Sequence, residues 1–322
     1  MNDASKFGTM ALAIGAFIAV IGVLLFIASR FSGRRSDRWV ALLLLLPTVL
    51  MLLVGLIYPG IRTIYESFFN AAGNSFIGID NYKTIFTDPD QRKVLRNTVV
   101  WVLLTPFAAT GIGLVYAILI DRARLESVAK ALIFLPMAIS FVGASIIWRF
   151  VYEYRPDQGS IKQIGLLNQI LVSLGLSPHQ WLLEQPWNTL FLCIVMIWIQ
   201  AGFAMTVLSA AIKAIPEDIV EAARLDGVKR FGMFRYVTLP TIRPSVVVVL
   251  TTIGIATLKV FDIVRTMTGG NFGTSVVANE FYSQSFRADN QGLGAALAVL
   301  LFLLVIPIVA YNVRQLRASE AR

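Results

Sequence analysis

The sequence predicts an all-α integral membrane protein with seven transmembrane helices. Of its 322 residues, 57% are hydrophobic and 15% are charged, whereas soluble domains contain about 25% charged residues. The apolar residues form runs without Asp, Glu, Lys or Arg, and most runs exceed the ~18–20 residues that a helix needs to cross a bilayer. The runs are Phe7–Ser29, Trp39–Ile61, Asn97–Ile120, Ala131–Trp148, Gln185–Ile212, Pro244–Leu258 and Asn290–Val313. Helices are expected because the backbone N–H and C=O groups at the edges of an open sheet would lack hydrogen-bond partners in lipid.

The first run, Phe7–Ser29, is predicted to be a retained helix with its N-terminus outside the cell. Few charged residues precede the run, whereas four arginines follow it within Arg30–Arg38. A cleaved signal peptide, the alternative, carries its basic residues in front of the apolar run. Because basic residues mark the cytoplasmic side, the C-terminus is expected in the cytoplasm and the chain in the inner (cytoplasmic) membrane as a multi-pass protein. The net charge of +9 then reflects topology, and no nucleic-acid partner is expected.

The sequence does not indicate an enzyme. The single cysteine, Cys193, lies inside an apolar run, and the single histidine, His179, lies in a predicted outer loop. One residue of each kind makes neither a disulfide nor a metal cluster. The chain also lacks a Gly-rich phosphate loop and a Ser/His/Asp set. We therefore expect no catalytic residue, cofactor or metal site in this chain.

Three polar segments are predicted to lie outside the cell, namely Arg62–Arg96, Arg149–Glu184 and Thr268–Asp289. The second contains several Gly and Pro residues, and a short amphipathic helix is expected around Ile161–Leu174. Together the segments form either a docking surface or solvated connectors.

The inner segment Lys213–Arg243 carries the most information. Pro216 suits the first position of a helix, where a backbone N–H is not needed. Acidic residues follow in the first turn, where negative charge suits the helix dipole, and Gly227 is well placed as a left-handed stop. The sequence therefore predicts a short helix over Glu217–Asp226. A second amphipathic segment, Phe231–Leu239, is expected to end at Pro240.

On physical grounds alone, this segment is either a partner-binding helix or an elbow that packs on its own chain. A motif favours the first interpretation. Glu221-Ala222-Ala223, then Gly227 after three residues, then Val237-Thr238-Leu239-Pro240 after nine resembles the EAA motif of permeases in binding-protein-dependent importers. Only Val237 departs, since isoleucine is usual there.

Weaker resemblances point to sugar-importer permeases of the maltose type and extend from about Trp39 to Arg317. The matching residues are Tyr58-Pro59, Ser67-Phe68, Phe76–Tyr82, Asn97-Thr98, Trp148-Arg149, Gly165, Asn168, Phe261-Asp262 and Thr268-Gly269-Gly270. The resemblance implies a six-helix type I ABC importer core over 39–316 with a coupling loop at 213–243. Residues 1–38 would add one N-terminal helix and a basic cytoplasmic loop, and 317–322 would form a cytoplasmic tail.

The resemblance also implies partners. Two cytoplasmic ATPase subunits would bind ATP and Mg²⁺, and one would grip the coupling helix. A second homologous permease would complete a path that alternates its access, and an extracytoplasmic binding protein would deliver a sugar, expected to be an α-glucoside or another oligosaccharide. The expected coupling residues are Glu217, Asp218, Glu221, Ala222, Ala223, Asp226, Gly227, Leu239 and Pro240.

The substrate path is expected near the end of the sixth run, where Lys259, Asp262 and Arg265 are spaced three apart and would share one arc of a helix. Ionisable residues at membrane depth usually face a cavity or one another. These residues therefore either line or gate the path, or form a Lys259–Asp262 pair that orients the helix end. The expected path residues are Gln200, Phe203, Thr257, Lys259, Phe261 and Asp262.

Three other functions are compatible with parts of the sequence. An ion-gradient-driven secondary transporter would work without an ATPase. A membrane enzyme or receptor would need catalytic or ligand-gating residues. An ABC importer permease for a non-sugar solute, such as glycerol phosphate, would have nearly the same motifs.

Overall fold

The computed structural model describes residues 36–121, 124–156 and 163–320, together with a few helical positions between 8 and 26. The predicted first helix, Phe7–Ser29, lies largely outside these residues. Within them, regular structure is helical apart from one antiparallel bridge between Phe69 and Phe76. The predicted all-α class is confirmed.

Contacts within the chain define two compact units, Met1–Tyr65 and Glu66–Arg322. In the first unit, α2 (Ser36–Leu52) leads through a π-helical turn (Leu53–Ile57) into α3 (Tyr58–Glu66). No residue of its most apolar window is buried in the chain itself. The predicted domain boundaries after residues 38 and 316 stay predictions.

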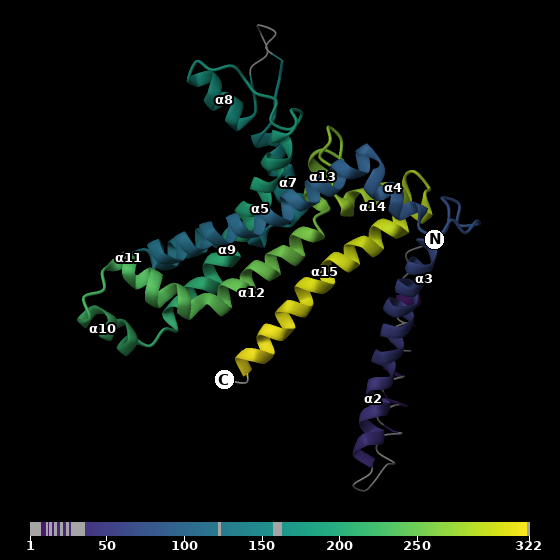
Figure 1. Ribbon diagram of the computed structural model, residues 1–322, viewed down its shortest axis with the longest axis horizontal. Coiled ribbons are helices and arrows are strands. Elements are labelled where there is room, and N and C mark those ends of the chain that lie inside the picture. Colours follow the sequence, from purple (N-terminus) through teal and green to yellow (C-terminus); the bar gives the residue numbers. More distant parts are fainter. Residues whose placement is uncertain are drawn as a thin grey trace. The chain divides into compact units, whose positions relative to one another are not determined.

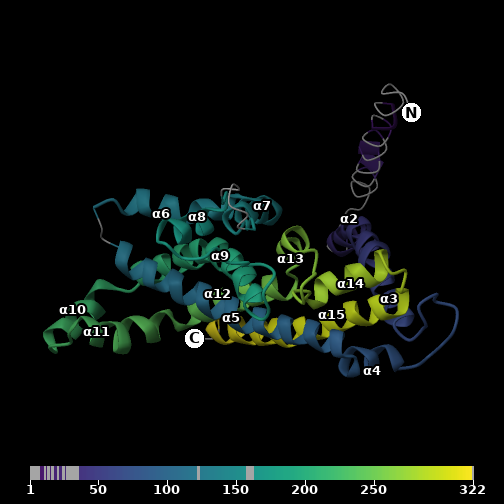
Figure 2. The same ribbon diagram turned by 90° about the horizontal axis from the view of Figure 1, so that it is seen from above.

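The second unit consists of long helices with short elements at two opposite ends. Figures 1 and 2 show α10 and α11 at one end, α4, α13 and α14 at the other, and α5, α12 and α15 between them. Its helices are α4 (Asp80–Thr87), α5 (Pro89–Ile120), α6 (Glu126–Phe134), α7 (Phe141–Val151), α8 (Leu166–Ser173), α9 (Trp187–Lys213), α10 (Glu217–Leu225), α11 (Arg230–Gly232), α12 (Leu239–Leu258), α13 (Asp262–Met267), α14 (Val277–Phe286) and α15 (Gln291–Glu320).

Among the described residues, five helical stretches are long and apolar enough to cross a membrane. They are Leu44–Glu66, Pro89–Ile120, Trp187–Lys213, Arg230–Leu258 and Gln291–Arg314. A sixth span is broken, because α6 with its 3₁₀ extension and α7 meet at 101°. Ser140 is the N-cap of α7, the helix after the bend, because its Oγ accepts a hydrogen bond from the N–H of Gly143. The total of seven stays a prediction, because the first run is largely undescribed.

Glycines allow the central helices to approach closely. A Cβ on Gly113 of α5 would lie 2.5 Å from the Cβ of Ala204 in α9. A Cβ on Gly202 of α9 would overlap the carbonyl oxygen of Ile133 in α6. Small residues at helix contacts are typical of membrane proteins, where close packing replaces the hydrophobic effect. The result is a tightly packed α5–α9–α6 centre.

Candidate functional site: the α10 end and the broken helix

The predicted coupling helix is present as α10, Glu217–Leu225, with Asp226 as its C-cap. Pro216 lies one position outside the helix, with ψ 138°, and not at its first turn as predicted. Gly227 has φ 78°, which suits glycine. Its N–H donates to Arg224 O at 3.0 Å, and the N–H of Val228 donates to Ala223 O at 3.0 Å. This pair of bonds is a Schellman stop, so α10 has a defined end.

The two sides of α10 differ. Val220 and Ala223 are half-buried toward the chain, whereas Ala222 is exposed together with Ile219 (46%) and Leu225 (89%). On its inner side lies a cavity of about 890 Å³. Its lining includes Ile118, Leu119, Asp121, Ile212, Lys213, Ile215, Glu217, Val220, Arg224, Val228, Arg230, Met233, Phe234 and Thr238. The outward apolar side chains of α10 therefore have no cover within the described chain.

The prediction that the next segment ends at Pro240 is wrong. Helical structure continues without interruption from Arg230 to Leu258, and Leu239 and Pro240 begin α12 inside it. A proline in an α-helix clashes with the carbonyl four residues earlier. Here a π-helical turn, Met233–Thr238, directly precedes Pro240, and its wider hydrogen-bonded ring makes room. The same order, a π-turn and then a proline, occurs at Leu53–Ile57 and Pro59.

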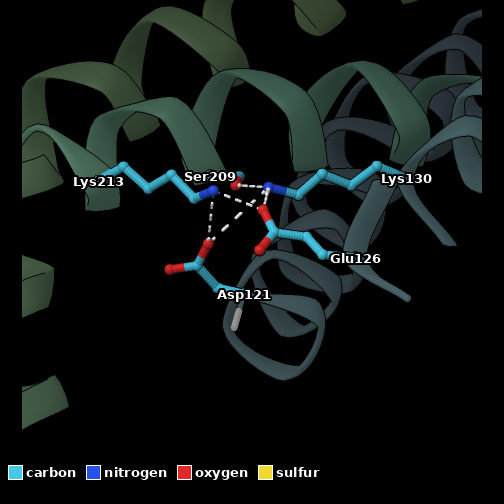
Figure 3. A network of polar contacts seen from close by, with 5 residues as sticks. All are labelled: Asp121, Glu126, Lys130, Ser209 and Lys213. Atoms are coloured by element: carbon cyan, nitrogen blue, oxygen red, sulfur yellow. Dashed lines mark hydrogen bonds and ion pairs between the residues drawn. The ribbon is translucent and has the colours of Figure 1, made fainter. Parts of the chain in front are cut away.

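A network of charged side chains joins the helix ends beside α10 (Figure 3). Lys213 ends α9 and lies 2.5 Å from Glu126 and 3.4 Å from Asp121. Lys130 of α6 lies 2.7 Å from Glu126, 3.8 Å from Asp121 and 2.5 Å from Ser209 Oγ. Sequence reasoning missed this group. Only the Glu126–Lys130 spacing of four residues pointed to it.

At the opposite end of the unit, residues of the sugar-permease resemblance hold loops in place. The Asn97 amide donates to Gly273 O at 2.6 Å and Ser275 O at 3.0 Å, and Thr98 Oγ1 accepts from the N–H of Val277. Asn168 bonds the backbone of Glu153 and His179. The short helix predicted around Ile161–Leu174 is α8, Leu166–Ser173, while residues 157–162 are not described. These motif residues build an ordered surface.

The arc predicted for Lys259, Asp262 and Arg265 is wrong, because α12 ends at Leu258 and α13 begins only at Asp262. The alternative, an ion pair between Lys259 and Asp262, is also not formed, although both side chains are described. Lys259 is exposed and Asp262 is half-buried. Arg265 lies over the ring of Tyr282, 4.7 Å from its centre.

The break after Leu258 lies beside the interior of α9 and not beside its end. Thr257 Oγ1 is 4.0 Å from Met196 Sδ, and Met196 is nine residues inside the Trp187 end of α9. Nine residues correspond to roughly 13 Å of helix. The charged side chain of Lys259 is therefore exposed well inside the length of the neighbouring span.

The remaining predicted path residues differ in whether their side chains are packed or hydrogen-bonded within the chain. Thr257 is fully buried, and its hydroxyl donates to Ile253 O at 2.7 Å. Phe203 packs against the core, and Phe261 packs on Tyr282 with ring centres 5.1 Å apart. Gln200 is 9% exposed, thirteen residues from each end of α9, and its amide makes no hydrogen bond within the described chain. Gln200 thus differs from Thr257, whose hydroxyl is already hydrogen-bonded within the chain.

No three His, Cys, Asp or Glu residues of the described chain lie together as metal ligands. The described chain is helical, with five stretches long and apolar enough to cross a membrane. The chain belongs to the family of binding-protein-dependent transport system inner membrane components, whose model matches residues 11–317. It is therefore an inner-membrane protein.

Relatives and solved structures agree with this family. The chain is 47% identical over 274 residues to the osmoprotective compounds uptake permease protein GgtC of Synechocystis sp., covering 85% of this chain and 98% of that one. It is 44% identical over 273 residues to the alpha-glucoside transport system permease protein AglF of Rhizobium meliloti, covering 84% and 81%. Its fold resembles a chain of a bacterial ABC transporter involved in alginate import, with a TM-score of 0.74, 23% identity, and coverage of 88% and 96%.

Proposed function

We propose that this chain is a permease subunit of an ATP-driven sugar importer and that α10 is the helix gripped by an ATPase subunit. The observation that carries the proposal is the exposed apolar side of α10, formed by Ile219, Ala222 and Leu225. Exposed apolar groups that adjoin one another on a polar segment mark contact sites for other proteins. The Schellman stop at Gly227 keeps this side in a fixed orientation.

The partners follow from this assignment. The family depends on a binding protein, which would deliver its solute to the loop surface at the end opposite α10. A second, related permease would close the path, and two ATPase subunits would supply ATP and Mg²⁺. The proposed orientation places the N-terminus outside and both α10 and the C-terminus in the cytoplasm, in line with the basic residues near α10.

The proposed solute is an α-glucoside, because a relative with 44% identity bears that name. An osmoprotective solute is the second candidate, on the basis of the relative with 47% identity. Gln200 offers an unpaired amide halfway along α9 for a sugar hydroxyl. Lys259 is costly to expose to lipid at its depth, which supports its placement on a water-filled path together with Asp262.

Two substitutions on the exposed side of α10 test the docking proposal. Ala222→Trp adds bulk, and Leu225→Asp replaces an exposed apolar side chain by a charge. Both variants are expected to insert normally and to lose co-purification of the ATPase subunit. Ala222 is a sharper test than Ala223, which faces its own chain, or Gly227, where a side chain strains the backbone.

The matched control is Ala288→Trp, at an exposed position between α14 and α15. This variant should retain the ATPase subunit, because it lies at the opposite end of the unit. Retention of the ATPase by both α10 variants would refute the assignment of α10.

A further inference from the structure

We propose that Asp121, Glu126, Lys130 and Lys213 form an ionic clamp that ties α6 to the end of α9, so that movement of α10 is passed to the broken span. The proposal rests on the proposed function for its source of movement. The four residues come from three places in the chain: Asp121 caps the C-terminus of α5, Glu126 and Lys130 lie on α6, and Lys213 ends α9.

The geometry of the clamp is that of a network. Each lysine lies within 4.0 Å of both carboxylates, and Lys130 also bonds Ser209 Oγ one turn before Lys213. Figure 3 shows the two amino groups converging on the carboxylates from opposite sides. Removal of any one of the four charges removes two of these ion pairs at a site of reduced solvation.

Partial burial makes this network stronger than an ordinary surface pair. The side chains of Asp121, Glu126 and Lys130 are 14%, 22% and 25% exposed, while that of Lys213 is 50% exposed. Exposed pairs contribute little because water and salt screen them. Here three of the four side chains are mostly shielded, so the network can hold two helix ends together.

Its position connects α10 with the broken span. Three residues, Ala214 to Pro216, separate Lys213 from the start of α10. Such a short connection transmits a displacement of α10 to the end of α9. On the other side, α6 leads into the 101° break before α7. Because Gly202 contacts the Ile133 backbone, α6 is held to α9 at a second point, near Gln200. The clamp and this contact make α6 follow α9.

A charge swap tests the clamp in two settings. In the isolated chain, the thermal midpoints of Lys213→Glu, Glu126→Lys and the double variant form a mutant cycle. Each single variant should lower the midpoint, and the double variant should lose clearly less than the two single losses added together, because the swapped pair attracts again while Asp121 and Lys130 each meet a like charge. Lys213→Met provides a neutral variant if reversal prevents folding. Lys93→Glu is the control, since Lys93 pairs with Asp90 at 3.0 Å on an exposed surface elsewhere.

The second setting is the assembled complex in lipid vesicles with its binding protein. The single variants should still co-purify with the ATPase, which separates the clamp from α10 docking. Solute-stimulated ATP hydrolysis and solute transported per ATP should fall by about fivefold or more, the lower end of coupling between sites. Lys213→Met should lower both in the same direction as Lys213→Glu, because it removes the ion pairs of Lys213 with Glu126 and Asp121. Lys93→Glu should change neither.

If the change in midpoint of the double variant equals the sum of the two single changes, Lys213 and Glu126 do not interact, and the clamp is overturned. Full stimulation in Lys213→Glu and Lys213→Met would overturn its role in transmission. Failure of the unmodified chain to bind an ATPase would instead contradict the proposed function, and the cycle in the isolated chain would still decide whether the clamp exists.

Discussion

Two buried amide side chains show how the same chemistry serves structure in one place and is free for binding in another. Asn168 is fully buried and uses both ends of its amide, donating to Glu153 O and His179 O and accepting from the N–H groups of His179 and Trp181. Gln200 has no such partner within the described chain. A buried polar group normally has its hydrogen bonds satisfied, so the amide of Gln200, halfway along α9, differs from that of Asn168 in being available for the binding role proposed for it.

This contrast predicts opposite effects of similar substitutions. Gln200→Leu should raise the KM of transport and leave the thermal midpoint of the purified chain nearly unchanged, because no internal hydrogen bond is lost. Asn168→Leu should lower that midpoint, since it leaves several buried groups unpaired at about 1–3 kcal/mol each. Transport assays and melting curves on both variants check the pair. A large loss of stability in Gln200→Leu with an unchanged KM would show that Gln200 stabilises the fold and does not bind the solute.

At the scale of elements, the close contacts at Gly113 and Gly202 determine how α5, α6 and α9 approach. Lipid gives no hydrophobic drive for helices to associate, so close packing must supply it. The approach at Gly202 matters most, because α6 has no other glycine contact with α9 and precedes the 101° break. A change there moves the whole broken span.

We therefore expect Gly202→Ala to force α6 away from α9 and to destabilise the chain by about 1–3 kcal/mol, the usual cost of overpacking. Gly111→Ala in α5 is the matched control, because its Cβ would meet no atom within 4 Å. The control should be neutral or slightly stabilising, since alanine favours helices. Thermal unfolding in detergent measures both, and equal midpoints would contradict the close contact.

At the scale of the whole molecule, two apolar surfaces of the described chain are not covered by the chain itself. The most apolar window within Leu44–Glu66 buries no residue against its own chain, and no described residue covers the outward side of α10. The family is defined by dependence on a binding protein. The ATP chemistry that drives transport would come from other subunits.

The purified chain alone should therefore transport no solute when reconstituted in vesicles, with or without an ion gradient. Addition of the ATPase subunits, the second permease and the binding protein should produce ATP-dependent uptake. Gradient-driven uptake by the chain alone would support the secondary-transporter alternative instead. The solute held by the co-purified binding protein would identify the substrate.

The features that the sequence predicts well are local. Uncharged runs locate the spans within the described residues, and the acidic first turn with Gly227 locates α10 to within one residue. The helix break after Leu258 was missed, because nothing in Lys259–Phe261 resembles a strong stop such as Gly or Pro. The ionic clamp was missed for another reason: Asp121, Lys130 and Lys213 are far apart in sequence, and only the packing of α5, α6 and α9 brings them together. The free amide of Gln200 likewise appears only once its surroundings are known.

The π-helical turn at Met233–Thr238 restricts how the length of this segment can change in evolution. Such a turn holds one residue more than an α-helical turn. Deletion of one residue within it converts the turn to α-helix and leaves the flanking faces at their present angle, whereas a deletion in α12 rotates every later residue by about 100°. The first deletion, however, returns Pro240 to an α-helical interior, at about 3 kcal/mol. The proline and the turn are therefore expected to be gained or lost together.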